Sequence, residues 1–428
     1  MAIITNERHG LSEEQWQSNS PELTRARAII SSTLDSLNDD LRNLNQAIHS
    51  HPEICYEEVY AHDTITAFLE AHGFTVTRHA YGLATSFSAE AGSGGRLVVF
   101  CAEYDALPGI GHGCGHNLIA TASVAAFAGA AKALLDLGVA GRVRLLGTPA
   151  EEGGGGKAKL IKAGAFPAAQ AGGDENEGVW AAIMSHALPL GQIKEGWSGT
   201  AGFRSTALQR LKVEFHGRNA HAGQEPWNGV NALDAAVGAY TTISMLRQQI
   251  RPEERVQGVI EDGGRVPNII PDYTRMAWAV RSPDVSGVDA LFERVKNCCR
   301  ASALASGCTV DFTEQPPYME LRVNAALCNA YIEEMKGLGR DILFMDDKPS
   351  AAGTDMGNVS HVVPSFHGIF GIPTEPGVAV HSRNFASAAS TEEGHRAALE
   401  SAKGMAMLGL RVLAEPGLAE RARDNFHG

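Results

Sequence analysis

The chain has 428 residues, of which 44% are apolar and 20% charged, and its formal net charge is −13. These values are typical of a globular protein with a large buried core and two domains. The acidic balance, without a cluster of Lys or Arg, argues against nucleic acid or an anionic membrane as a partner.

Seven cysteines occur in the chain without the close spacing of a disulfide framework. Such thiols are typical of a reducing compartment. The polar N-terminus is also unlike a signal peptide. We therefore expect a cytoplasmic protein.

The N-terminal half of the chain predicts alternating helices and strands. Apolar residues recur at helical spacing between Leu34 and Ile48, which predicts one amphipathic helix. The continuous apolar run Leu97–Ala102 is typical of a strand covered on both faces, as in a parallel sheet. We further expect helices at residues 61–72 and from Asn117 through the Ala-rich run 122–137, and strands at residues 143–147 and 180–184. This alternation predicts a doubly wound α/β structure.

From residue 203 to 316 the pattern changes. Leu211, Val213 and Phe215 alternate with polar residues, which predicts a half-exposed strand. A helix at 228–249, strands near 256–261 and 273–280, a helix at 288–305 and a strand near 309–313 follow. The order β-α-β-β-α-β is that of a ferredoxin-like unit. We therefore expect a discontinuous domain, residues 1–202 and 317–428, with a central mostly parallel sheet flanked by helices, and an inserted α+β domain at 203–316. The first domain should end in a helix capped by Ser390 and Glu393.

Cys114 and His116 lie two residues apart in the Gly-flanked segment Gly111–Asn117. In an extended loop both side chains can converge on one metal ion. Taken alone, a buried structural Cys and a surface His explain this pair better.

Glu151 and Glu152 follow a predicted strand and precede four glycines. Adjacent side chains point apart, so one carboxylate can bind metal while the other acts as a general base. A solvated acidic turn is the alternative, although glycines allow a close approach of the backbone to a ligand.

Other candidates gain weight only in combination. Asp105 ends a strand segment and can orient a metal-binding His, or can be only a turn residue. His186 and His381 are ordinary histidines unless they supply the missing nitrogen ligands. In the inserted domain, His221 can be an exposed loop residue, while Asn268 and Arg281 can bind a substrate carboxylate.

Taken in order, these motifs resemble peptidase family M20, in its amidohydrolase branch. The stretches Tyr104–Asn117 and Gly353–Ser360 are most similar to the β-alanyl-lysine dipeptidase and aminobenzoyl-glutamate hydrolase subgroup. The resemblance runs from about His51 to the C-terminal helix. It implies a catalytic domain with a lid domain that forms a homodimer.

The resemblance also implies roles for particular residues. The residues at the metal-ligand positions are Cys114, His116, Glu152, His186 and His381. Glu151 matches the general base, and His221 matches a lid His that reaches the neighbouring subunit's site and stabilises the oxyanion. Asn268, Arg281, Gly353 and Thr354 fall at substrate-binding positions.

The expected function is therefore hydrolysis of an amide bond in a small N-acyl amino acid or dipeptide by metal-activated water. Two divalent metal ions are expected per subunit; thiolate and imidazole suit zinc, and carboxylates admit manganese or cobalt. The alternatives are deacetylation, biosynthetic acyl transfer or condensation at the same site, and a non-catalytic binding protein of the same fold.

Overall fold

The computed structural model describes residues 20–169, 178–346 and 352–427, so the N-terminal segment compared with a signal peptide lies outside the described residues. Within these residues the chain forms two compact units. Of the described residues, the first unit comprises 20–169, 178–204, 321–346 and 358–427, and the second comprises 205–320 and 352–357. The second unit thus takes in a late segment that the expected range 203–316 leaves out.

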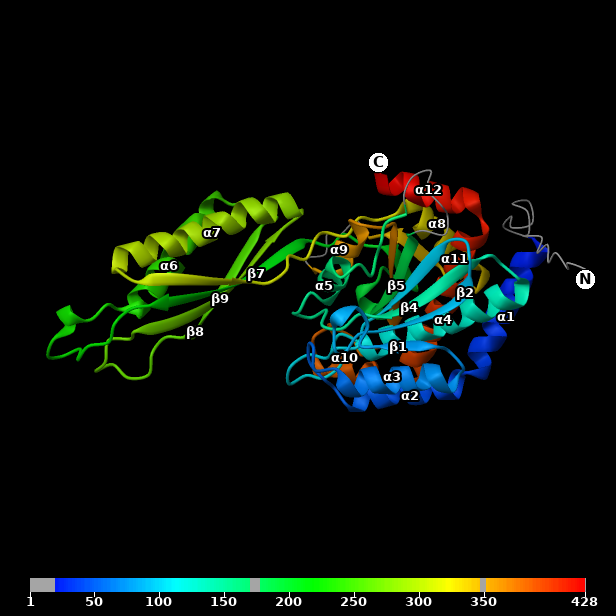
Figure 1. Cartoon of the computed structure of the whole chain (residues 1–428), viewed down its shortest axis with the longest axis horizontal. Coiled ribbons are helices and arrows are strands. Elements are labelled where there is room, and N and C mark those ends of the chain that lie inside the picture. The colour runs from blue at the N-terminus through cyan, green and yellow to red at the C-terminus, as the bar shows by residue number, and fades with distance from the viewer. Residues whose placement is uncertain (1–19, 170–177, 347–351, 428) are drawn as a thin grey trace, which may run out of the picture. The chain divides into compact units, whose positions relative to one another are not determined.

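The first unit is built on an eight-stranded sheet whose order is β1-β2-β4-β3-β5-β12-β6-β11. Strands β1, β2, β4 and β5 of this sheet are labelled in Figure 1. The strands are β1 Val76–Arg78, β2 Phe87–Ser93, β3 Leu97–Ala102, β4 Gly141–Gly147, β5 Val179–Pro189, β6 Gly199–Gly202, β11 Ile342–Met345 and β12 Ser365–Ile372. The four central strands β4, β3, β5 and β12 are parallel to one another. The expected mostly parallel sheet is confirmed in this central part.

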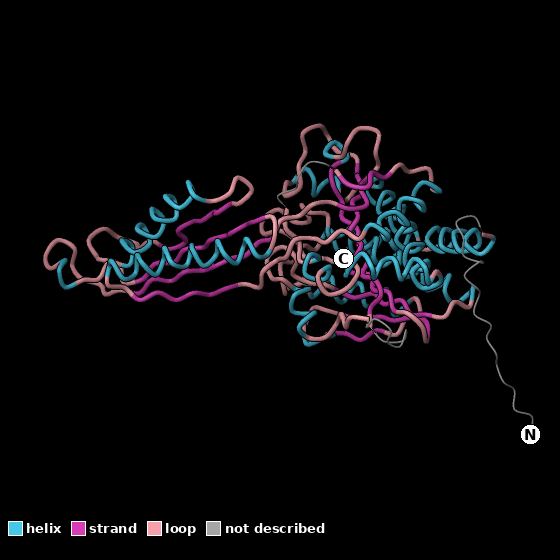
Figure 2. Tube along the Cα trace, turned by 90° about the horizontal axis from the view of Figure 1, so that it is seen from above, coloured by secondary structure: helices cyan, strands magenta, loops and turns pink. Residues whose placement is uncertain are grey.

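Helices pack along this sheet (Figure 2). They are α1 Pro21–Ser36, α2 Asn38–Ser50, α3 Val59–Ala71, α4 His116–Leu137, α5 Gly156–Lys162, α8 Ala325–Gly337, α10 Arg383–Ala388, α11 Glu392–Ala414 and α12 Pro416–His427. The short helix α9, Met356–Ser360, includes residues of both units. Helices α4 and α11 contact each other and the central strands β3, β4 and β5, and their apolar residues form the main core.

Helix α4 is the one helix among the described residues that is long and apolar enough to cross a membrane, with 89% of its most apolar window buried in the structure. The predicted helix is therefore part of the core of the first unit.

Three local predictions need correction. The single helix expected across Leu34 to Ile48 is two helices, because Leu37 has non-helical backbone angles between α1 and α2. Strand β5 extends to Pro189, so His186 lies inside the strand and not beyond its end. The cap of α11 is Thr391, whose side chain accepts a hydrogen bond from the Gly394 N–H, and not Ser390.

The second unit has a four-stranded antiparallel sheet of order β10-β7-β9-β8. Its elements are β7 Ala207–His216, α6 Ala232–Leu246, β8 Arg255–Asp262, β9 Tyr273–Ser282, α7 Val285–Ser306 and β10 Thr309–Glu314. Both helices pack against the sheet and against each other over a separate apolar core. The predicted ferredoxin-like order is confirmed.

Candidate metal centre

The predicted metal ligands and their neighbouring carboxylates come together in the first unit. They lie in the segments that follow β3 and β4, in the loop that leads into α4, within β5, and in the loop before α10. The ligand atoms of three groups lie within 4.8 Å of one another: Cys114, His116 and His186; Cys114, Glu152 and His381; and Glu103, His116 and Glu151. Because Cys114 and His116 each belong to two of these groups, the arrangement offers adjoining cation positions.

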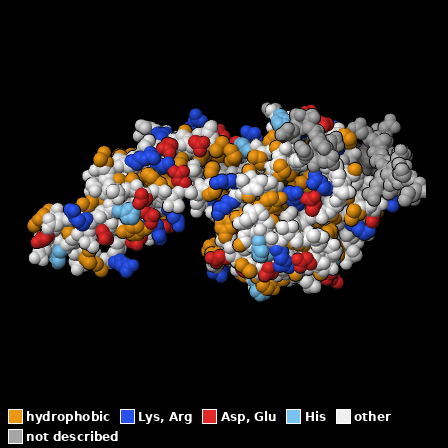
Figure 3. Space-filling model, viewed as in Figure 1, with side chains coloured by type: hydrophobic (Ala, Val, Ile, Leu, Met, Phe, Trp, Pro, Cys, Tyr) orange, Lys and Arg blue, Asp and Glu red, His pale blue; other side chains and the backbone are white. Residues whose placement is uncertain are grey.

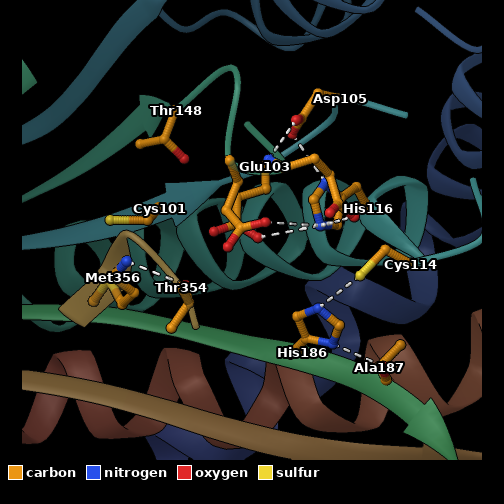
Figure 4. A network of polar contacts seen from close by, with 12 residues as sticks. Cys101, Glu103, Asp105, Cys114, His116, Thr148, His186, Ala187, Thr354 and Met356 are labelled. Carbon is orange, nitrogen blue, oxygen red and sulfur yellow. Dashed lines mark hydrogen bonds and ion pairs between the residues drawn. The ribbon is translucent and has the colours of Figure 1, made fainter. Parts of the chain in front are cut away.

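His116 is the centre of this cluster (Figure 4). Its Nδ1 lies 2.9 Å from Oδ1 of Asp105, and both side chains are fully buried. Burial alone would raise the pKa of Asp105, but His116 and the N–H groups of Glu152 and Glu151 lower it below its ordinary value. Burial alone would lower the pKa of His116, but Asp105 and Cys114 raise it well above its ordinary value. The carboxylate holds one proton on Nδ1, so a bound cation would replace the proton on Nε2 and use its lone pair. The predicted orienting role of Asp105 fits this contact.

Nε2 of His116 is surrounded by carboxylate oxygens. Glu103 Oε2 lies at 3.7 Å, and Glu151 Oε2 and Glu152 Oε1 each lie at 3.8 Å. This buried nitrogen makes no hydrogen bond to any described residue. A divalent cation would satisfy it and the surrounding oxygens together.

The Cys114 thiol and the His186 imidazole lie beside His116 in the same cluster. Cys114 Sγ lies 3.4 Å from Nε2 of His186, whose Nδ1 is 2.8 Å from the Ala187 carbonyl oxygen. Burial, and then His116, lower the pKa of His186 to about 4, which keeps the ring neutral and able to bind metal. Burial raises the pKa of the Cys114 thiol well above its ordinary value, and a bound cation would reverse this shift.

His381 is the last of the five predicted metal ligands and lies in the loop before α10. Its Nε2 lies 3.5 Å from Oε1 of Glu152, and about half of its side chain is exposed. The residue has a φ of 62°, in the left-handed region, and its N–H donates to the Gly113 carbonyl at 2.7 Å. A strained backbone at a ligand position is typical of functional sites. One thiol, three imidazoles and several carboxylates at these distances fit two divalent metal ions.

The turn that presents Glu151 and Glu152 is braced by residues that the sequence analysis missed. Ala150 has a φ of 61°, and its N–H donates to the buried Glu58 Oε1 at 2.8 Å. The Tyr56 hydroxyl donates to the Gly154 carbonyl at 2.6 Å. Glu58 and Tyr56 precede a helix in a polar segment, and nothing in that local pattern marks them as buried partners of a distant turn.

The remaining predicted residues lie in the second unit. His221 and Asn268 are exposed neighbours, since His221 bridges Ile269 and the Ala222 N–H donates to the Asn268 carbonyl. The N–H groups of Gly223 and Gln224 donate to Nδ1 of His221, which leaves its Nε2 to carry the proton. The ring can therefore donate a hydrogen bond through Nε2.

Arg281 lies at the other end of the second unit's sheet. It pairs in register with Leu208 at the start of β7, whereas His216 ends that strand. A Cβ on Gly353 would lie 3.7 Å from Nη1 of Arg281, so these two predicted substrate-binding residues meet. Thr354 is buried, and its Oγ1 accepts from the Met356 N–H at 3.1 Å.

Comparison with known proteins gives a consistent result. Residues 99–403 match the model of peptidase family M20/M25/M40. The chain is 39% identical to the Xaa-Arg dipeptidase of Mus musculus over 96% of its own length and 95% of that protein. It is 30% identical to one of the subunits of the p-aminobenzoyl-glutamate hydrolase of Escherichia coli, over 68% of this chain and 61% of that protein.

Solved structures share the fold at lower identity. A dinuclear metal-binding peptidase of the M20 family from Bacillus subtilis is 22% identical, with a TM-score of 0.61 over 89% of this chain and 99% of its own. The aminobenzoyl-glutamate utilization protein of Klebsiella pneumoniae is 18% identical, with a TM-score of 0.68 over 89% of this chain and 98% of its own.

Proposed function

The chain belongs to peptidase family M20/M25/M40 and is a metal-dependent amide hydrolase, and we propose that its substrates are dipeptides and small N-acyl amino acids. The observation that carries this proposal is the buried cluster around His116, where a thiol, imidazoles and carboxylates converge on one place. The similarity to an Xaa-Arg dipeptidase over nearly the whole chain supports the dipeptide class.

We assign Cys114, His116, Glu152, His186 and His381 as the residues that hold two metal ions. When bound, the cations polarise the substrate carbonyl and lower the pKa of a water molecule toward neutrality. Zinc suits the thiol and imidazoles, and manganese or cobalt also suits the carboxylates. Asp105 keeps the His116 ring in the orientation and tautomer that this role requires.

Glu151 acts as the general base in this proposal. Its carboxylate lies on the edge of the cluster, 3.8 Å from His116 Nε2, and is fixed by the braced turn at Ala150. Glu151 accepts the proton of the attacking water and then delivers it to the departing amine nitrogen.

His221 donates from Nε2 to the oxyanion that develops on the substrate carbonyl. In this proposal, His221 and Arg281 of the same chain serve two different substrate sites. Eight strand residues separate the register position of Arg281 from the end of β7, a span of roughly 27 Å at about 3.4 Å per residue. If Arg281 holds the substrate carboxylate in its own subunit, His221 comes from a partner, which supports a homodimer.

Asn268 lies beside the loop of His221, so we assign it to the same site, where it binds substrate in the partner subunit. Gly353 and Thr354 bind substrate beside Arg281. The cytoplasmic location expected from the thiols stays a prediction. Acidic and basic side chains are interspersed on the face drawn in Figure 3. The expectation that neither nucleic acid nor a membrane is a partner stays a prediction.

The test combines elemental analysis of the purified protein with product analysis on a substrate panel. The panel holds Xaa-Arg dipeptides, β-alanyl-lysine, N-acetyl amino acids and p-aminobenzoyl-glutamate, each with and without a chelator. We expect about two metal equivalents per chain and chelator-sensitive release of amino acids from dipeptides. Turnover of acetyl compounds alone favours deacetylation, and product formation only in the reverse direction favours condensation. A protein without metal, unaffected by chelator and without turnover favours a binding role.

A further inference from the structure

Glu103 and Lys157 form a buried ion pair beside the metal centre. Their side chains are at most 1% exposed, and Lys157 Nζ lies 2.5 Å from Glu103 Oε1. Glu103 follows β3, and Lys157 is the second residue of α5. The pair thus joins the ends of two elements that border the cluster, although neither residue was among the predicted site residues.

Only one oxygen of Glu103 is used by this pair. Oε2 is buried and accepts no hydrogen bond from any described residue. It points toward the cluster and lies 3.7 Å from Nε2 of His116, an equally buried atom that makes no hydrogen bond to the described residues either (Figure 4). Leaving a charged oxygen buried without a partner costs free energy. A cation held by this oxygen and by His116 Nε2 would satisfy both atoms together.

The spacing agrees with shared coordination. Ligand atoms on one tetrahedral ion with bonds of about 2.0–2.2 Å lie roughly 3.3–3.6 Å apart. The Glu103–His116 distance of 3.7 Å is close to this, and Glu151, the proposed general base, lies beside the same position.

We propose that Glu103 is an additional ligand of the divalent metal held by His116, and that Lys157 is its fixed counter-ion. Lys157 anchors Oε1 of Glu103 and leaves Oε2 turned toward the cluster, so this ligand is oriented before the metal arrives. It also cancels one negative charge in a centre that already contains Asp105, Glu151 and Glu152. The inference rests on the metal centre of the proposed function but not on its substrate.

The competing explanation is that the pair only joins β3 to α5. A buried ion pair can often be replaced by neutral side chains with little loss of stability, whereas removing one partner leaves an uncompensated charge. Two variants therefore separate the explanations. Lys157→Met removes the counter-ion and keeps the Glu103 carboxylate, while Glu103→Gln combined with Lys157→Met removes both charges.

The experiment measures metal stoichiometry by elemental analysis, metal affinity by competition with a chelator, and unfolding of the metal-free protein. We expect Lys157→Met to lower the stability of the metal-free protein but to keep two metal equivalents. The double variant should regain stability without metal, yet bind one of the two ions about 10- to 100-fold more weakly. If the wild-type protein hydrolyses no substrate of the panel, the proposed function is contradicted, but the measurements of metal content and metal affinity still test this proposal.

The proposal is overturned if the double variant binds both ions with wild-type affinity, or if Lys157→Met loses metal to the same extent as the double variant. A double variant that does not fold leaves the question to Glu103→Gln alone, for which wild-type metal affinity in the folded protein would also overturn the proposal.

Discussion

The first unit buries the side chains on which its chemistry depends, whereas the second unit exposes several of its own. His116 and Asp105 are shielded from solvent and joined by a 2.9 Å contact. His221 and Asn268 instead lie on an exposed loop pair, and Arg281 is at the far end of the same sheet. The first unit therefore brings the ligands of a metal centre together by itself, while in the proposed function the second unit offers separate contacts that need substrate and a partner subunit.

The difference has an energetic origin. Burying carboxylates, a thiol and imidazoles together is costly unless every group finds a partner, so their positions are tightly fixed. Exposed side chains carry no such cost and keep the freedom to meet a substrate. Changes in the first unit should therefore abolish chemistry or metal binding, and changes in the second should weaken a complete reaction.

The largest effect is expected for Glu151→Gln. The variant should keep its fold and metal but lose hydrolysis by several orders of magnitude, because no general base remains to accept and return the proton. Turnover kinetics together with elemental analysis check this. Glu152→Gln is the matched control, since it should lose metal as well. Near-normal turnover of Glu151→Gln would remove Glu151 from the mechanism.

His221→Ala is expected to lower kcat by about 10²–10³-fold, the usual effect of removing one donor to an oxyanion. The proposed homodimer gives a sharper test. Mixed dimers of His221→Ala and Glu151→Gln subunits combine one intact base with one intact histidine, so activity should reappear if His221 serves the partner's site. If the mixed dimers stay as inactive as the parents, His221 acts within its own chain.

The sequence predicted those elements of the fold that have a hydrophobic pattern of their own. The apolar run of β3 and the alternation of β7 identify strands without tertiary information. The edge strand β1 has only three residues, and β6 is a Gly-Thr-Ala-Gly segment, so neither has a pattern of its own. The N-terminal helix was read as continuous because apolar spacing carries on through the break at Leu37.

The candidate site divides in the same way. Cys114, His116 and the Glu151–Glu152 pair stand in Gly-rich motifs that mark them in the sequence. Glu103, Lys157 and Glu58 have no such marker, because each looks like an ordinary charged residue beside a strand or helix. Only tertiary packing shows that they are buried.

A smaller effect, on stability and its pH dependence, is expected for Glu58→Gln. Burial, and then Asp105, raise the pKa of Glu58 from 4.5 to about 7. The folded state then binds more protons than the unfolded state between these values, so this group's contribution to stability is full below pH 4.5 and is lost as pH rises through 7. Glutamine mimics the protonated acid and lacks this slope.

The measurement is chemical unfolding of the metal-free protein across that pH range. Relative to the variant, the wild type should lose up to about 3 kcal/mol between pH 5 and 8. Thr85→Val, which removes the hydroxyl that donates to Glu58 Oε2 at 2.8 Å, should keep the slope. Parallel curves for wild type and Glu58→Gln would contradict the assignment.

The smallest effect is expected for Arg281→Lys in the second unit. Lysine keeps the charge but cannot bind a carboxylate through two parallel hydrogen bonds, so KM for a dipeptide should rise about 10-fold with little change in kcat. Arg255→Lys, on the neighbouring strand in register with Arg281, is the matched control and should leave KM unchanged. A dipeptide amide lacks the carboxylate, so wild type and Arg281→Lys should hydrolyse it with similar KM. An equal rise in KM for the amide would show that Arg281 acts on the fold of the lid and not on the substrate carboxylate.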